Sequence, residues 1–250
     1  MAAALALLAR SWATMLRDRA PAARLVGAFY ASQLGKYLPG GIWQPAGLVL
    51  GAAGDGLSKR RAAGAFVAFA LVYAATGAAV GGPIVAATAS ELPAAVRALV
   101  ALGPLALLAV HPAVLSALVR RLPARLREKV PADVLPAPAQ VATAVALAAG
   151  GLLCWGVAYA VLLGPLGGGA GVPLAIGASI VAWLVGFVAV PVPAGAGIRE
   201  AVLVALLPGP SAAIVAASVL HRAAGVAAEL VLNLGRALAT RRDAGPPTSA

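Results

Sequence analysis

The sequence predicts an all-α, polytopic helical membrane protein with about four full spans and two re-entrant broken-helix hairpins in an inverted repeat. Hydrophobic residues make up 62% of the 250-residue chain, charged residues only 11%, and the mean hydropathy is +0.94. Soluble domains are rarely so apolar. Several apolar runs are long enough to cross a bilayer, and two others are interrupted by Pro and Gly. No long polar stretch separates them, so we expect a single membrane domain over residues 1–240.

Four apolar runs predict full spans, because a bilayer crossing needs about 20 apolar residues. They cover residues 62–84, 94–118, 140–164 and 211–236. The second run contains His111 followed by Pro112, and a proline inside a helix removes a backbone donor. This run is therefore expected to be kinked.

The two ends of the chain predict less regular structure. Residues 1–24 place an apolar stretch before Arg10, the reverse of a signal peptide, and the stretch is short for a span. We expect an incomplete or interfacial N-terminal helix, the remnant of a longer N-terminus. Residues 241–250 are polar and rich in Pro and Ser or Thr near their end, which predicts a disordered tail.

The basic residues predict the orientation. The net charge of +11 is confined to short clusters between apolar runs, a pattern typical of cytoplasmic loops rather than of nucleic-acid binding. The clusters at residues 59–61, 120–129 and 236–242 fall on one side of the membrane when the spans are counted. The sequence thus predicts a multi-pass protein of the cytoplasmic (inner) membrane with a cytoplasmic C-terminus and no nucleic-acid partner.

The same count of crossings predicts two hairpins, over residues 25–56 and 172–210, each leaving and returning on one face. Their breaks read LPGGIWQPAGLVL from Leu38 and VPAGAGIREAVLVAL from Val192. The likeness favours an inverted repeat, a common architecture of secondary transporters, although chance similarity in an Ala/Gly-rich chain is the alternative. The break residues are Pro39, Gly40 and Gly41 in the first hairpin and Pro193, Gly195 and Gly197 in the second.

Broken helices at membrane depth predict a cavity, because freed backbone groups must face protein or water. A half-helix starting after Gly41 or Gly197 would direct its N–H groups into that cavity and suit a phosphate or carboxylate. Lys36 and Arg199 lie beside the breaks and would add positive charge. The alternative is that Pro and Gly only kink ordinary spans while Lys36 extends to the interface.

A polar stripe marks the last predicted span. Its members recur at three- and four-residue spacing, which places them on one helical face that should point into the bundle. We expect Arg199 to pair with Glu229, and Glu200 with Arg222, either as a structural network or around an anionic headgroup. The stripe consists of Ser218, Arg222, Gly225, Glu229, Asn233 and Arg236.

Catalytic and metal signatures are not found. The sequence has no HExxH, GxSxG or Walker motif, and Cys154 is its single cysteine. Only Glu200 and Glu229 would be available as a catalytic pair for an intramembrane enzyme. We therefore expect no enzyme activity, no cofactor and no bound metal.

Two motifs resemble the lysylphosphatidylglycerol synthase transmembrane region, also called the flippase-like domain. They are SQLGKYLPGGIWQPAGLVL from Ser32 and WLVGFVAVPVPAGAGIREAVLVALL from Trp183, followed by Arg222 and Glu229. The resemblance covers about residues 25–240 and implies a stand-alone member without the soluble synthase domain. It departs from the family at residues 66–77, which carry no acidic residue.

The resemblance implies movement of modified lipids between leaflets. We expect translocation of a membrane lipid with an anionic headgroup, or of a polyprenyl-phosphate-linked glycan, through a cavity between the hairpins. The alternative is a non-transporting partner or scaffold for an envelope glycosyltransferase or lipid synthase. The residues expected to bind substrate are Lys36, Tyr37, Arg199, Glu200, Arg222 and Glu229.

Overall fold

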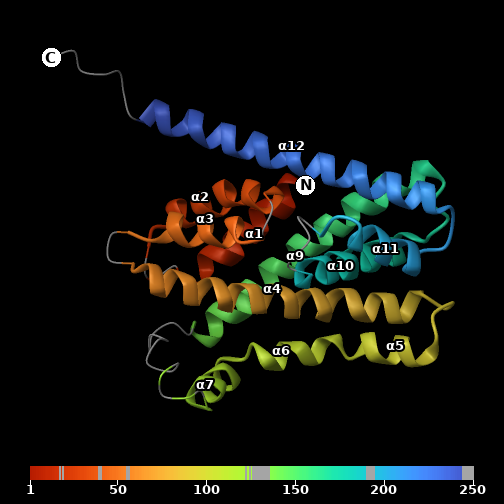
Figure 1. Ribbon diagram of the computed structural model, residues 1–250, viewed down its shortest axis with the longest axis horizontal. Helices are drawn as coiled ribbons and strands as arrows, with labels where there is room; N and C mark the ends of the chain where they lie inside the picture. The colour runs from red at the N-terminus through yellow and green to blue at the C-terminus, as the bar shows by residue number, and fades with distance from the viewer. Residues whose placement is uncertain are drawn as a thin grey trace.

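The protein is an all-α bundle in which two long helices run along the long axis and a third crosses obliquely between them, with shorter helices packed around these three (Figure 1). The computed structural model describes residues 1–16, 18, 20–38, 41–54, 57–121, 123, 125, 136–189 and 195–243. Within these residues every regular element is a helix, apart from one isolated bridge between Gly54 and Leu57.

Three helices are long and apolar enough to cross a membrane. They are α4 (Lys59–Thr88), α9 (Pro138–Leu163) and α12 (Ser211–Asp243). At 1.5 Å per residue each is about 39 Å or longer, against a hydrocarbon core of about 30 Å. These helices confirm three of the four predicted spans, and the chain is a multi-pass helical membrane protein.

The fourth predicted span, residues 94–118, is not one continuous helix. It is divided into α5 (Ala94–Ala101), η2 (Gly103–Leu105), α6 (Ala106–Ala109) and α7 (Pro112–Arg121). The path bends by 68° between Ala109 and Pro112, which confirms the kink expected there. The prolines at 104 and 112 explain the interruptions, because each lacks a backbone donor and clashes with the preceding turn. Hydropathy alone could not separate a bent or re-entrant segment from a full span.

The first predicted hairpin consists of α2 (Ala22–Gln33), the 3-10 turn η1 (Leu34–Tyr37) and α3 (Trp43–Ala52). Its two arms pack against each other, and the glycines of α3 allow close approach to α2. Gly47 faces Ser32, and Gly51 faces Ala28. Each arm is shorter than about 20 Å, so neither could cross a bilayer alone.

The second predicted hairpin consists of α10 (Val172–Val188) and α11 (Ile198–Leu206), which also pack together. Its break contains Gly195 with φ 66° and Gly197 with φ 80°, and the first break contains Gly41 with φ 66°. Glycine has no Cβ and adopts this left-handed conformation without strain. Of the remaining predicted break residues, Pro39, Gly40 and Pro193 lie outside the described residues.

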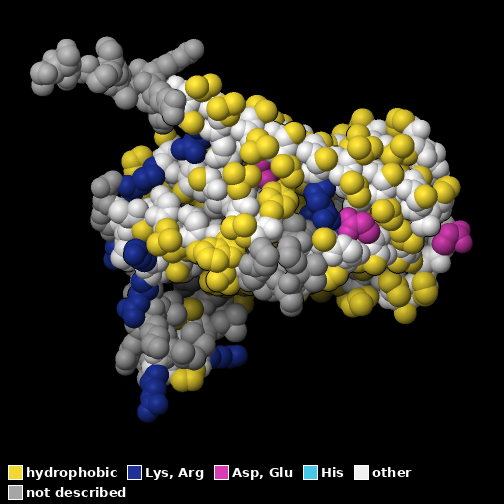
Figure 2. All heavy atoms as spheres, turned by 45° about the horizontal axis from the view of Figure 1, so that its top comes forward, with side chains coloured by type: hydrophobic (Ala, Val, Ile, Leu, Met, Phe, Trp, Pro, Cys, Tyr) yellow, Lys and Arg dark blue, Asp and Glu magenta, His cyan; other side chains and the backbone are white. Residues whose placement is uncertain are grey.

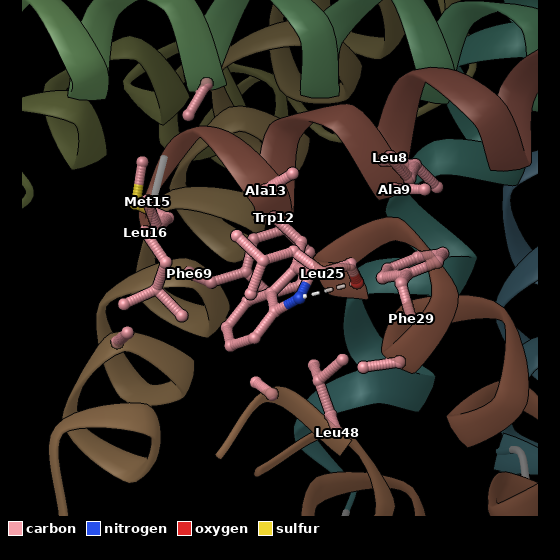
Figure 3. Packing of buried hydrophobic residues seen from close by; sticks show 14 of the residues in the cluster. Leu8, Ala9, Trp12, Ala13, Met15, Leu16, Leu25, Phe29, Leu48 and Phe69 are labelled. Carbon is pink, nitrogen blue, oxygen red and sulfur yellow. Dashed lines mark hydrogen bonds between the residues drawn. The ribbon is translucent and has the colours of Figure 1, made fainter. Parts of the chain in front are cut away.

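The N-terminal helix α1 (Ala2–Thr14) has 13 residues and lies inside the bundle against α9. Its Ser11 hydroxyl donates a hydrogen bond to the carbonyl of Ala144 (2.8 Å). Trp12 is fully buried, donates from its indole to the Leu25 carbonyl (3.1 Å) and meets Phe69 edge-on (Figure 3). α1 is thus a short helix with one face buried in the bundle, and its expected place at the membrane interface stays a prediction.

The two hairpins occupy opposite halves of the long axis (Figure 1). α2 and α3 lie toward the end where α4 begins, whereas α10 and α11 lie toward the end where α12 begins. Lys and Arg side chains gather at the first of these ends (Figure 2). α12 continues to Asp243, so residues 241–243 of the predicted tail are helical, and residues 244–250 lie outside the described residues.

Candidate ligand-binding cavity

A small cavity lies where the two hairpins meet α9 and α12. Its volume is about 40 Å³, room for a few water molecules but not for a whole lipid headgroup. Its walls come from η1, α9, α10, α11 and α12. The lining residues are Lys36, Tyr37, Trp155, Tyr159, Ser179, Ala182, Trp183, Arg199, Leu203, Ser218, His221 and Arg222.

Lys36 and Glu229 form an ion pair that joins the first hairpin to α12. The Glu229 side chain is fully buried, and that of Lys36 is 22% exposed. The Lys36 ammonium also donates to the amide oxygen of Gln33 (3.2 Å) and lies 5.2 Å from the centre of the Tyr37 ring. The first hairpin is thus attached to α12 through one buried charge pair.

Glu200 and Arg222 form the second ion pair, at 2.8 Å, as the sequence predicts. The same carboxylate oxygen accepts a hydrogen bond from the Ser218 hydroxyl (2.7 Å). Its other oxygen accepts from the backbone N–H of Gly197 (2.7 Å), which caps the start of α11. The second hairpin is therefore attached to α12 as well, through a carboxylate whose two oxygens are both occupied.

Arg199 has no carboxylate partner within the described part of the chain, so its predicted pairing with Glu229 is wrong. Lys36 occupies that carboxylate instead. The Arg199 side chain is threaded between two glycines, where an added Cβ on Gly186 would lie 2.7 Å from its Cγ and one on Gly195 would lie 2.9 Å from its Nε. The fold leaves a space that only glycine at both positions provides, and it holds a guanidinium at the cavity.

Three buried polar atoms of this site lack a hydrogen-bond partner among the described residues. They are Nε of Arg199, the hydroxyl oxygen of Ser179 and the Oε2 oxygen of Glu229. Buried polar groups in proteins are nearly always hydrogen-bonded, and leaving one unpaired costs about 1–3 kcal/mol. Arg199 and Ser179 line the cavity, so a ligand or waters in it would satisfy their unpaired atoms, whereas Glu229 is not among the lining residues.

The polar stripe of α12 faces the bundle interior, as predicted, and it touches both hairpins. Ser218 and Arg222 contact Glu200 of α11. Further along, the Asn233 amide donates to the Tyr30 carbonyl (2.9 Å), and the Arg236 guanidinium donates to the Gly27 carbonyl (2.9 Å). α12 therefore holds α11 with the first half of its stripe and the first hairpin with the second half.

The six predicted substrate residues all belong to this region, but with different placements. Lys36, Tyr37, Arg199 and Arg222 line the cavity, whereas Glu200 and Glu229 lie behind it as partners of lining cations. The described break glycines and the first residues of α3 and α11, Trp43 and Ile198, are not among the lining residues, although Arg199, the second residue of α11, is. Among the described residues, the predicted anion site at open helix ends is therefore not found. Side chains line the cavity instead, and the Gly197 N–H already donates its hydrogen bond to the Glu200 carboxylate.

The sequence does not predict several of the residues that line the cavity. Trp155, Tyr159 and Trp183 lie in apolar runs, where an aromatic side chain looks the same whether it packs or lines a cavity. His221 approaches both Trp155 (4.8 Å) and Tyr159 (5.6 Å) edge-on, and its Nε2 lies 2.9 Å from the Trp155 carbonyl oxygen. Aromatic residues make up only 5% of the chain, and this rarity is the one feature of the sequence that could have drawn attention to these three residues.

The charges of the site sum to one excess positive charge. Lys36, Arg199 and Arg222 are opposed by Glu200 and Glu229. The described residues contain no group of three or more His, Cys, Asp or Glu side chains that could hold a metal ion. The arrangement suits an anion that offers hydrogen-bond acceptors.

The fold and the site define a class, a multi-pass helical membrane protein with a polar cavity at the meeting point of two broken-helix hairpins. Comparison with known proteins adds no family to this class. No protein-family model, no curated protein and no solved structure matches the chain.

Proposed function

We propose that the protein binds an anionic lipid, or a lipid-linked glycan, in this cavity and moves it between the leaflets of the cytoplasmic membrane. The observation that carries the proposal is the unpaired guanidinium of Arg199, held between Gly186 and Gly195 in a site with one excess positive charge. Arg199 is partly buried, with a buried Nε, and a cation without a counter-ion inside a membrane protein is costly and commonly marks a substrate or ion pathway.

The architecture supports movement as well as binding. We propose that the two hairpins are re-entrant, enter from opposite faces and form an inverted repeat, as in transporters whose sites lie near the bilayer midplane. The basic end of the molecule, with Lys59 at the start of α4, would then face the cytoplasm together with the C-terminus of α12. The likeness of the two break motifs to the flippase-like domain agrees with this proposal.

A second candidate function is a non-transporting scaffold for an envelope glycosyltransferase or lipid synthase. The observation that favours it is that both carboxylates are already paired and the cavity holds only a few waters. In that case the charge network would only hold the hairpins to α12. Arg199 separates the two functions, because it pairs with neither carboxylate.

The test is a leaflet assay with purified protein in liposomes carrying labelled anionic lipids. We expect translocation above that of empty vesicles, and a loss of about tenfold or more for Arg199→Gln, since a charge-assisted contact contributes about 1.5–3 kcal/mol.

The matched control is Arg97→Gln. Arg97 lies on α5 and donates to the Ala86 carbonyl (2.9 Å), outside the cavity. This variant should translocate normally. No translocation by folded wild-type protein over several anionic lipid classes would contradict the proposed function.

A further inference from the structure

The unpaired atoms of the cavity restrict the chemistry of a headgroup that could occupy it. This inference rests on the proposed function, because it concerns the same cavity. Arg199 lines the cavity and offers an N–H that needs an acceptor. The Ser179 hydroxyl also lines it and can serve as donor or acceptor. A complementary headgroup therefore carries an anionic acceptor for Arg199, and a hydroxyl on it can pair with Ser179.

The anionic part fits a phosphate best. The guanidinium fork makes parallel N–H bonds to phosphate oxygens, and such charge-assisted bonds are roughly twice as strong as neutral ones. Arg199 is the cation of the site whose charge no carboxylate offsets among the described residues. A phosphate beside it would bring the net charge of the site to about zero or below.

A headgroup ammonium does not fit. The two carboxylates that could accept one already hold Lys36 and Arg222, at the Oε1 oxygen in each case. The described lining residues include Lys36, Arg199 and Arg222 but no carboxylate, so an ammonium in the cavity would face like charges that are weakly screened. A neutral hydroxyl can pair with Ser179 without that repulsion.

The remaining walls favour a polyol. Tyr37, Trp155, Tyr159 and Trp183 line the cavity, four of the chain's twelve aromatic residues. Aromatic faces carry partial negative charge and pack against the C–H faces of glycerol or a sugar ring. The hydroxyls of such a ligand would still reach the Ser179 and Ser218 side chains on the cavity wall.

We infer that the lipid taken by this cavity has a headgroup in which a phosphate is esterified to a polyhydroxyl alcohol, glycerol or a sugar, and which carries no ammonium group. This class includes phosphatidylglycerol and lipid-phosphate sugars. It excludes aminoacylated lipids such as those whose movement the motif resemblance implies, and also phosphatidylethanolamine.

The experiment compares four lipids in the leaflet assay, with the wild-type protein: phosphatidylglycerol, a polyprenyl-phosphate sugar, phosphatidylethanolamine and lysyl-phosphatidylglycerol. We expect at least one of the first two to move about tenfold faster than either ammonium lipid, a difference of about 1.4 kcal/mol in barrier. The faster of the two polyol lipids shows whether the cavity prefers a glycerol or a sugar headgroup. Equal or faster movement of an ammonium lipid overturns the inference.

A separate measurement of lipid binding distinguishes failure of this inference from failure of the proposed function. Trp155 and Trp183 line the cavity, so tryptophan fluorescence in detergent reports entry of short-chain versions of the same lipids. Preferential binding of the polyol phosphates without translocation supports the inference while contradicting transport. Absence of preference in both arms overturns the inference. Ser179→Ala should reduce the preference severalfold, and Arg97→Gln should leave it intact.

Discussion

Glu229 is a carboxylate with no exposure in the middle of a long apolar helix, and Lys36 is its counter-ion. Removing one member of a buried pair leaves the other as an isolated charge, which costs about 3–5 kcal/mol, whereas removing both can be nearly neutral. The pair also joins segments 193 residues apart in the chain. Its energetic role is therefore measurable by a double-mutant cycle.

We expect Lys36→Met and Glu229→Gln each to lower the free energy of unfolding by about 3–5 kcal/mol, with the larger loss for Lys36→Met because it leaves the fully buried Glu229 unpaired. The double variant should be less destabilised than the sum of the two. Reversible unfolding in micelles measures all four proteins. Additive losses would show that the two side chains are not coupled.

At the same scale, the sequence predicts the charged residues of the site but only part of their pairing. The spacing on α12 indicates that Ser218, Arg222 and Glu229 share a face, and the structure confirms it. It could not indicate that Lys36 reaches Glu229 before Arg199 does, since η1 places Lys36 through contacts distant in sequence. Pairing of charges is a tertiary property.

At the scale of elements, the position of Arg199 depends on the glycines that it passes. Gly186 lies near the end of α10, and a methyl group there would overlap the Cγ, Cδ and Nε atoms of Arg199. These atoms belong to the stem and first nitrogen of the side chain, so they cannot move aside without moving the guanidinium. Overpacking of this kind typically costs 1–3 kcal/mol or displaces the offending group.

Gly186→Ala should therefore reduce translocation toward the level of Arg199→Gln, with the protein still folded. Gly235→Ala is the matched control, because Gly235 lies on α12 with nothing within 4 Å of an added Cβ. This control should keep full activity and gain a little stability from the better helix propensity of alanine. Full activity of Gly186→Ala would show that the position of Arg199 does not matter for transport.

The elements themselves differ in how far sequence predicts them. The long helices follow from runs of apolar residues, and the breaks follow from glycines that adopt left-handed backbone in both hairpins, Gly41 and Gly195. Residues 94–118 are apolar enough for a span, yet their prolines divide them into short helices. Trp155, Tyr159 and Trp183 of the cavity are not predicted for a related reason, because hydropathy reports how apolar a segment is and not what surrounds each side chain.

On the scale of the whole molecule, α12 contacts both hairpins, and the cavity where they meet is small. A lipid headgroup does not fit into about 40 Å³, so transport requires the hairpins to separate from α12 or from each other. The contacts that would open are the Lys36–Glu229 and Arg222–Glu200 pairs.

The most direct measurement is an experimental structure of the wild-type protein in bilayers rich in phosphatidylglycerol. We predict a widened cavity with a lipid phosphate about 3 Å from the Arg199 guanidinium and a headgroup hydroxyl at Ser179. A cavity that stays closed in that lipid, with Arg199 bonded to a carboxylate and lipid phosphates only at the two ends of the molecule, would contradict the account.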